Sequence, residues 1–254
     1  MMKKVIITFL ILSATLVAMP SFAQESDKAS QKGAHALLGF NMVSMYYYRG
    51  HDFGGVSLLP AINVSRNGFS LTVFGSKGFE SKDFKTIGLE LGYQRNGLKA
   101  LITDFWVGVD VPGFKSSYFK YGDGTTRYYE VSLVYDFKFM EVGWNTIFTG
   151  DDYNPVGGKR LYSSYFEVAA PFRIGEVDFR AHLGLSPWKS FYHKDFKANE
   201  DMGKNPGFNV VNTGIKAERT LFVLDKLAIP FSVQFVVNPY KQQAFLFAGV
   251  GLWL

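Results

Sequence analysis

The last residues of the chain, 244–254, alternate two kinds of side chain. One set of positions holds Leu246, Ala248, Val250, Leu252 and Leu254, and the other holds Phe245, Phe247, Gly249, Gly251 and Trp253. Because successive residues of a strand point to opposite faces, this alternation predicts a strand without a charged face. A soluble domain rarely ends on such a strand, whose free edge would promote aggregation, whereas a closed barrel in lipid has no free edge. The pattern therefore predicts the closing strand of a membrane barrel.

The same alternation recurs along most of the chain. We expect strands at 35–48, 57–65, 69–77, 85–94, 98–109, 127–137, 140–148, 161–172, 177–186, 208–219, 227–238 and 243–254. Asn67-Gly68 and Asn96-Gly97 supply the positive φ angles of tight hairpin turns. Pro60 and Pro230 fall inside expected strands, and since proline cannot donate to a ladder, we expect bulges or strand ends there. The sequence thus predicts an all-β fold, a single transmembrane antiparallel up-and-down β-barrel of about twelve strands.

The connections between the expected strands are alternately long and short. Short turns lie on the side of both termini, and most long, polar connections lie on the other: 49–56, 78–84, 110–126, 149–160 and 187–207. Outer-membrane barrels have this asymmetry, with short periplasmic turns and longer outer loops. We therefore expect both termini in the periplasm. Alternate positions in the strands should contact lipid, among them Leu71, Leu89, Leu133, Leu183, Val233 and Leu252.

The N-terminal segment has the pattern of a secretory signal peptide. Lys3-Lys4 precede an apolar run, and Ala23 completes a small-x-small cleavage site. We expect residues 1–23 to be the signal peptide, 24–34 a short periplasmic segment and 35–254 the barrel. Cleavage removes the two lysines and so lowers the formal net charge from +5 to +3.

Composition supports this class and excludes others. Aromatic residues make up 17% of the chain and glycine occurs 26 times, as in barrels with aromatic girdles and glycine-punctuated strands. The chain has no cysteine, which excludes disulfides and iron–sulfur clusters, and its mild positive charge does not indicate a nucleic-acid partner. A lipocalin-like calyx or a sandwich would need a polar outer face, whereas the more hydrophobic face recurs in nearly every expected strand.

The C-terminus also resembles the sorting signal of bacterial outer-membrane barrels. The resemblance rests on Gly249, Leu252 and Leu254, a glycine followed by two outward hydrophobic residues. The chain departs from that signal in ending on leucine rather than an aromatic residue, and in having Phe247 where a polar residue is usual. The resemblance implies recognition by the barrel-assembly machinery.

Short motifs near the start of the expected barrel resemble a known family. They are Tyr46-Tyr-Tyr-Arg49-Gly50, Pro60-Ala61 and the strand that begins at Gly68-Phe69. In this order they are similar to the opening of the TorF-type porins, the family that carries the Gcw_chp domain. Asp52 stands where that family usually has serine. The resemblance implies an outer-membrane barrel with a pore, and it brings no catalytic residues.

Candidate catalytic chemistry is sparse. The four histidines have no metal-ligand spacing, and no nucleophile elbow or phosphate-binding loop occurs. Asp178-x-Arg180-x-His182 could orient a histidine for general-base work, but we interpret these residues as a charge network inside the barrel. Asp151-Asp152 with Asn154 could bind a divalent cation, and we interpret them as a solvated loop. We expect no enzyme, no metal and no cofactor.

The function that the sequence favours is a narrow outer-membrane channel for small solutes. Twelve strands lie between the eight whose lumen side chains fill and the sixteen that leave a wide pore. The expected pore-lining residues are Glu90, Glu130, Asp136, Glu141, Glu167, Asp178, Arg180, His182, Lys216 and Glu218. Their acidic excess predicts weak cation selectivity, reduced if Arg180 pairs with Asp178 or Glu167. Two alternatives remain open: a barrel enzyme acting on lipids, and a structural or adhesive barrel with a plugged lumen.

Besides the transported solute, we expect outer-membrane lipids and lipopolysaccharide as partners. Basic residues gather in the expected outer loops, where they can contact lipopolysaccharide phosphates. They are Lys115, Lys120, Lys159, Arg160, Lys189, Lys194, Lys197 and Lys204.

Overall fold

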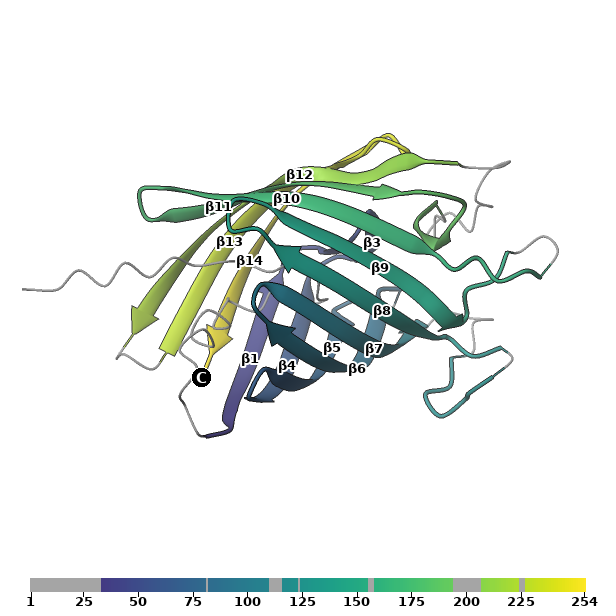
Figure 1. The fold of residues 1–254 in the computed structure, drawn as a ribbon, viewed down its shortest axis with the longest axis horizontal. Coiled ribbons are helices and arrows are strands. Elements are labelled where there is room, and N and C mark those ends of the chain that lie inside the picture. The colour runs from purple at the N-terminus through teal and green to yellow at the C-terminus, as the bar shows by residue number, and fades with distance from the viewer. Residues whose placement is uncertain are drawn as a thin grey trace, which may run out of the picture.

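The protein is a closed barrel of twelve antiparallel strands (Figure 1). The computed structural model describes residues 33–80, 82–109, 116–122, 124–154, 158–193, 207–223 and 227–254. The barrel strands are β1 (His35–Val43), β4 (Ser57–Arg66), β5 (Phe69–Gly78), β6 (Phe84–Arg95), β7 (Leu98–Val109), β8 (Arg127–Asp136), β9 (Glu141–Gly150), β10 (Ser164–Ile174), β11 (Val177–Ser186), β12 (Asn209–Val223), β13 (Leu227–Asn238) and β14 (Gln243–Trp253). The predicted fold class is confirmed.

The first and last strands close the ring. β1 pairs with β14 from Gly39 opposite Trp253 to Val43 opposite Gly249. The backbone of Leu38 exchanges hydrogen bonds with that of Leu254, at 3.2 and 3.0 Å. Every other barrel strand pairs with its neighbours in sequence order, and the pair β1–β4 completes the sheet. The C-terminal strand is therefore paired on both sides, which explains how an uncharged strand can end the chain.

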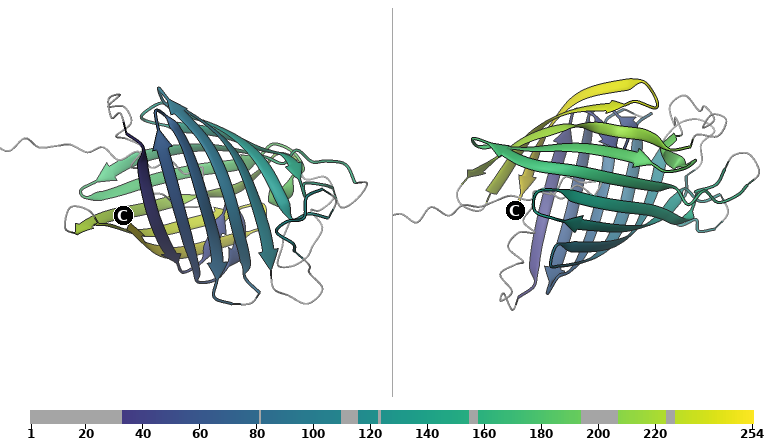
Figure 2. Two further views of the ribbon diagram at one scale, coloured as in Figure 1. Left: turned by 90° about the horizontal axis from the view of Figure 1, so that it is seen from below. Right: turned by 45° about the horizontal axis from the view of Figure 1, so that its top comes forward.

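The connections follow the predicted asymmetry. Asn67 and Gly68 have φ angles of 52° and 84°, and Asn96 and Gly97 have 50° and 81°, as a type I′ hairpin turn requires. These turns lie at the same end of the barrel as the C-terminus, and the long connections gather at the opposite end (Figure 2). We call the two ends the turn end and the loop end.

The two faces of the wall separate apolar from polar side chains. The six residues expected at the lipid face, from Leu71 to Leu252, all point outward with at least 37% of their surface exposed. Residues next to them in sequence, such as Ser132, point inward and are buried. The predicted register of inward and outward positions is therefore confirmed at these residues.

The two strand prolines do not interrupt the barrel, so the expected bulges or strand ends are wrong. The β4–β5 register is the same at Leu58 opposite Lys77 and at Ala61 opposite Phe74, on either side of Pro60. This register places Gly75 opposite Pro60, and the β13–β14 register likewise places Gly251 opposite Pro230. The β4–β5 and β13–β14 ladders omit the pairs at these prolines, which stay paired with the strand on their other side, and glycine leaves room for each ring.

The strand expected at 35–48 is too long, and the connection expected at 49–56 is not simply a polar loop. The wall strand β1 ends at Val43. Residues 46–48, expected to continue it, form β2 (Tyr46–Tyr48), which pairs with β3 (His51–Gly54) from the expected loop as a separate two-stranded hairpin. This hairpin lies within the ring of wall strands (Figure 1). Tyr46, His51 and Phe53 are each at most 4% exposed. Three tyrosines continue the period-two pattern of β1, so the pattern alone does not show where the chain leaves the wall.

Several predictions concern residues outside the described part of the chain. The signal peptide and nearly all of the segment 24–34 lie there, as do Lys115, Lys194, Lys197 and Lys204. Within the described residues, no helix has the length and apolar character needed to cross a membrane.

Candidate functional site

The hairpin of β2 and β3 crosses the lumen, and we call residues 46–54 the crossbar. Its turn is made by Arg49 and Gly50, with φ angles of 44° and 89°. A side chain at Gly50 would overlap the backbone oxygen of Val211 on β12. The turn therefore needs glycine both for its left-handed conformation and for its close approach to the wall.

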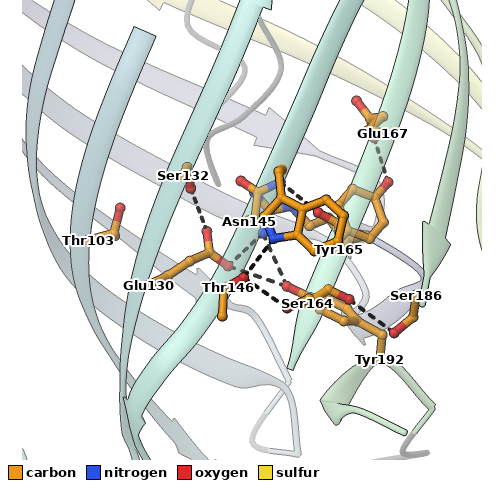
Figure 3. Close-up of polar contacts among 12 residues, drawn as sticks. Thr103, Glu130, Ser132, Asn145, Thr146, Ser164, Tyr165, Glu167, Ser186 and Tyr192 are labelled. Carbon is orange, nitrogen blue, oxygen red and sulfur yellow. Dashed lines mark hydrogen bonds and ion pairs between the residues drawn. The ribbon is translucent and has the colours of Figure 1, made fainter. Parts of the chain in front are cut away.

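Arg49 fastens the crossbar to one side of the barrel. Its guanidinium donates from Nη1 to Glu130 Oε2 on β8 at 2.7 Å and from Nη2 to Asn145 Oδ1 on β9 at 2.7 Å. It also lies 3.2 Å from the hydroxyl of Tyr192. The side chains of Arg49 and Glu130 are each only 5% exposed, so this is a buried and hydrogen-bonded ion pair. Ser132 donates to the other oxygen of Glu130 at 3.0 Å (Figure 3).

The other side of the crossbar is held by the connection between β13 and β14. The carbonyl oxygen of Gly50 accepts from Asn238 Nδ2 at 2.9 Å and from Lys241 Nζ at 3.3 Å. Lys241 Nζ also lies 3.1 Å from His51 Nδ1, which must accept because an ammonium only donates. The crossbar is thus anchored to opposite parts of the wall.

Aromatic side chains fill the loop-end half of the lumen around the crossbar. The ring of Phe53 lies 5.4 Å from that of Tyr46 and 5.6 Å from that of Phe84. The short 3-10 helix η2 (Phe191–His193) adds its own rings, with Phe191 at 4.8 Å from His51 and 5.2 Å from Tyr128. Among the described residues, one small cavity of about 10 Å³ lies between these rings, at the lower limit for one water molecule. The crossbar and the rings therefore fill this half of the lumen.

The apolar side chains facing the crossbar explain why 98–109 alternates poorly in sequence. The inward residues of β7 next to the crossbar are Phe105 and Val107, both buried in the aromatic cluster. Apolar side chains thus occupy both faces of this strand.

The turn-end half of the lumen carries a second charge network. Arg180 on β11 donates to Glu141 on β9 at 3.0 Å and to Glu167 on β10 at 2.8 Å. The hydroxyl of Tyr165 donates to Glu167 at 2.5 Å (Figure 3). It accepts from Asn212 Nδ2 at 2.9 Å. Because Tyr165 also lies under the Arg49 guanidinium at 5.0 Å, it connects the crossbar to this network.

The predicted lining residues are found on the inner face, with differences at the turn end. The buried ones are Glu90, Glu130, Glu141, Arg180, His182, Lys216 and Glu218, and Glu167 is half-buried beside them. Asp136 and Asp178 lie near the turns and are only partly buried. Asp178 pairs with Arg173 at 2.5 Å. Arg180 pairs with Glu167, which was one of the two partners expected for it.

The sequence did not identify the residues that close the lumen. Arg49, Asn145, Tyr165 and Tyr192 were missed, and so was the inward lysine Lys99, which lies near Glu90 and Glu141. One indication was available: a solvated loop rarely follows three consecutive tyrosines. The remaining contacts join residues far apart in sequence, and no local pattern contains them.

The interpretation of Asp151, Asp152 and Asn154 as a merely solvated loop is wrong at Asp152. Asp152 is 1% exposed and its carboxylate accepts from the backbone nitrogen of Ser163 at 2.8 Å and from its hydroxyl at 2.5 Å. Burial raises the pKa of Asp152, and the hydrogen bonds from Ser163 offset only part of this rise. Among the described residues, no three His, Cys, Asp or Glu side chains gather as a metal site would require. Ser163 in turn accepts from the backbone nitrogen of Phe191, so Asp152 positions η2.

His193 completes the attachment of η2. Its Nδ1 accepts from the backbone nitrogen of Ser190 at 3.2 Å, and its ring packs edge-on against Tyr240 at 4.7 Å. Burial lowers the pKa of His193 to about 4, and the nearby charges of Lys241 and Lys189 also lower it. The docked segment therefore holds a neutral histidine.

Comparison with known proteins identifies no family. No family model matches the sequence, and no curated protein matches it. Among solved structures, NanC porin is 11% identical with a TM-score of 0.45, over 85% of this chain and 98% of that one. An outer-membrane channel from Pseudomonas putida F1 is 10% identical with a TM-score of 0.42, over 88% and 96%. A mutant Rhodopseudomonas blastica porin is 14% identical with a TM-score of 0.33, and the chain spans 55% of its length.

These likenesses concern the barrel architecture alone. They identify neither a family nor a solute, and the specific resemblance to the TorF-type porins is not confirmed by them.

Proposed function

We propose that this protein is an outer-membrane channel for small solutes whose lumen is closed at rest by the crossbar. One observation carries the proposal. The barrel has an apolar outer face and a lumen with nine buried or half-buried charges, the five carboxylates and four cations named in the next paragraph. Charged groups are costly inside a barrel unless they are paired or hydrated, and a lumen of this kind is typical of barrels that admit water. Movement of the crossbar would connect the loop end to this polar half.

The charges inside predict the selectivity. Away from the wall turns, the inner face carries the carboxylates Glu90, Glu130, Glu141, Glu167 and Glu218 and the cations Lys99, Arg180 and Lys216, and the crossbar adds the cation Arg49. This leaves a small acidic excess once the ion pairs are formed. Fixed charge in a narrow passage favours ions of opposite sign, so we expect weak preference for cations when the channel is open.

Planar-bilayer recording with liposome swelling tests the proposal. In planar bilayers we expect brief openings of small conductance and a reversal potential whose sign shows preference for cations. Liposomes should swell only in small solutes. Replacement of Glu130 and Glu141 by Gln should remove the preference for cations. Arg219→Gln, which changes an exposed pair with Glu176 at the turn end, is the matched control and should leave the preference for cations unchanged. An anion-preferring reversal potential of the unmodified protein would exclude these carboxylates from the conducting path.

A second candidate is a structural barrel whose crossbar never moves. The burial of Arg49, His51 and Tyr192 favours it, because each is at most 6% exposed. The two candidates differ in bilayers, where a permanently plugged barrel inserts without conducting.

Catalysis of lipid hydrolysis is the third candidate, and we do not favour it. The described pair closest to a nucleophile and a base is Ser190 and His193, 3.1 Å apart. Both are at most 3% exposed, and Ser190 Oγ also lies 2.6 Å from Ser186 Oγ. We propose that this pair fastens η2.

The location follows the same proposal. We propose a bacterial outer-membrane protein that is exported by the signal peptide at 1–23 and inserted by the barrel-assembly machinery through Gly249, Leu252 and Leu254. Membership of the TorF-type porins remains a proposal that rests on the motifs around Arg49-Gly50 and Pro60-Ala61. Loss of outer-membrane accumulation on truncation of Leu252–Leu254, with rescue by a terminal Phe, would support the sorting signal.

A further inference from the structure

We propose that the lumen beside the crossbar binds a neutral sugar ring, with Phe245 and Phe247 of β14 against its face and Gln234 of β13 at its edge. The inference rests on the proposed channel and deepens it by naming the class of solute. It depends on aromatic rings that border open space inside the barrel, on a free amide next to them, and on neighbouring charges that are already paired.

The last strand carries two aromatic side chains into the lumen. Phe245 and Phe247 alternate with the exposed outward residues Leu246 and Ala248. The centroids of their rings lie 5.2 and 5.7 Å from that of Tyr47 in the crossbar. All three aromatic residues are only half-buried, so they border space inside the barrel that water reaches. Because the inner face of a channel is normally polar, these partly exposed rings are a candidate surface for binding a solute.

A row of polar side chains continues from these rings across the inner wall. The strand registers place Phe247 opposite Gln234 on β13, and Gln234 opposite Lys216 on β12. Lys216 lies in turn opposite Arg180 on β11. Residues directly opposite each other have Cβ atoms about 4.5–5.5 Å apart, so the ring and the amide are neighbours. Gln234 is half-buried and its amide forms no hydrogen bond with any described residue, so it can donate to and accept from a solute.

The charges at the far end of this row are already compensated. Lys216 Nζ lies 2.6 Å from Glu218 Oε2. Arg180 donates to Glu141 and to Glu167. A charged group of a solute would have to break one of these ion pairs, whose side chains are at most 12% exposed. A hydroxyl group can add to them instead, because it both donates and accepts. The row therefore favours a neutral solute with several hydroxyl groups.

A pyranose ring has both of the surfaces that these residues can bind. One face of the sugar ring carries C–H groups, whose hydrogens are slightly positive and are attracted to the negative face of an aromatic ring. The edge of the sugar ring carries hydroxyl groups, which hydrogen-bond with an amide and with paired charges. A linear polyol has the hydroxyl groups without a flat C–H face, and an aromatic solute has a flat face without the hydroxyl edge. A sugar ring is therefore the solute that uses the rings and the polar row together.

Saturation-transfer NMR on the purified, folded barrel in a sugar-free detergent tests the inference. The probes are methyl β-glucopyranoside, the linear polyol sorbitol and the charged solute lysine. We expect the glucoside to bind more tightly than sorbitol or lysine, and to receive saturation chiefly at the ring protons of one face. Phe247→Leu, which removes the aromatic ring and keeps an apolar side chain, should weaken glucoside binding on the order of tenfold. Gln234→Leu removes the amide alone and should weaken binding roughly two- to tenfold.

Two control variants separate loss of the site from general damage. Phe235→Leu removes a ring from the lipid face of β13, where Phe235 is 47% exposed, and should bind the glucoside normally. Phe247→Tyr keeps the aromatic ring and should keep the affinity.

Equal glucoside affinity of Phe247→Leu and the unmodified protein would overturn the inference, and so would equal or tighter binding of sorbitol or lysine. The NMR readout does not depend on conduction. Ring-dependent binding of the glucoside by a barrel that never conducts would refute the channel and leave the binding site standing. Conduction without ring-dependent binding would refute this inference alone.

Discussion

Release of the crossbar is the perturbation whose size the structure defines best. Replacing Arg49 by Gln keeps a hydrogen-bonding side chain but leaves Glu130 charged and buried without its cation. Breaking a buried pair by removing one partner costs about 3–5 kcal/mol. Since about 1.4 kcal/mol is a tenfold change in an equilibrium, the ratio of closed to open crossbar should fall on the order of 10²–10³-fold. Single-channel recording should therefore show open events that are far longer or more frequent.

A double-mutant cycle distinguishes loss of the pair from general damage. Glu130→Gln should open the channel for the same reason, because it leaves Arg49 buried and charged. The double variant Arg49→Gln/Glu130→Gln leaves no buried charge unpaired and should be more closed than either single variant. Arg219→Gln, at an exposed ion pair with Glu176 outside the lumen, should behave like the unmodified protein. Additive effects of the two lumen substitutions, or no effect of either, would refute the reasoning.

Three further predictions concern the wall and η2. Leu89→Arg should lower the free energy of folding in bilayers by about 2–4 kcal/mol, while Phe139→Arg in an exposed turn should lower it little. Equal losses of stability in urea titrations would contradict the assignment of Leu89 to the lipid face. Gly88→Ala places a methyl group in the ring of Phe74 and should lower stability by about 1–3 kcal/mol, so an unchanged denaturation midpoint would contradict the packing. His193 has a pKa of about 4 when docked and about 6.5 when free, so docking of η2 should be complete above pH 6.5 and weaken as pH falls toward 4. Hydrogen exchange of η2 measures this, and His193→Gln should abolish the pH dependence.

The packing of the lumen decides how well its inward positions tolerate arginine. The alternation of the strands alone predicts better tolerance there than at the lipid face, where a charge costs about 2–4 kcal/mol. Ser132 is only 1% exposed and hydrogen-bonds Glu130, and a side chain at Gly184 would overlap the hydroxyl of Tyr165. Arginine should therefore be disruptive at both sites, and an exposed turn such as that of Phe139 is the better control.

The strands of the barrel wall could be predicted because the sequence patterns that define them involve residues close together in the chain. Period-two alternation and the Asn-Gly turns depend on neighbours in sequence, and they placed the turns after Arg66 and Arg95 correctly. The strand that closes the barrel was also predictable, since an uncharged strand such as β14 needs partners on both edges.

The closure of the lumen could not be predicted in this way. The alternation of side chains does not distinguish a strand that continues in the wall from one that turns inward at Ser44. Tyr46 and Tyr48 fit the alternation in either case. The contact that decides the outcome joins Arg49 and Glu130, 81 positions apart. A charged residue at a predicted loop tip is read from sequence as solvated, and only its distant partner shows that it is buried.

Conductance of a barrel without its crossbar tests the central claim most directly. Residues 46–54 are replaced by a short Gly-Ser linker, and the variant is compared with the unmodified protein in planar bilayers after folding is verified by heat-modifiable migration on gels. The account predicts a barrel that stays open, with larger and steadier conductance and faster swelling of liposomes in small solutes. A folded variant that conducts no more than the unmodified protein would contradict the claim that the crossbar closes a channel.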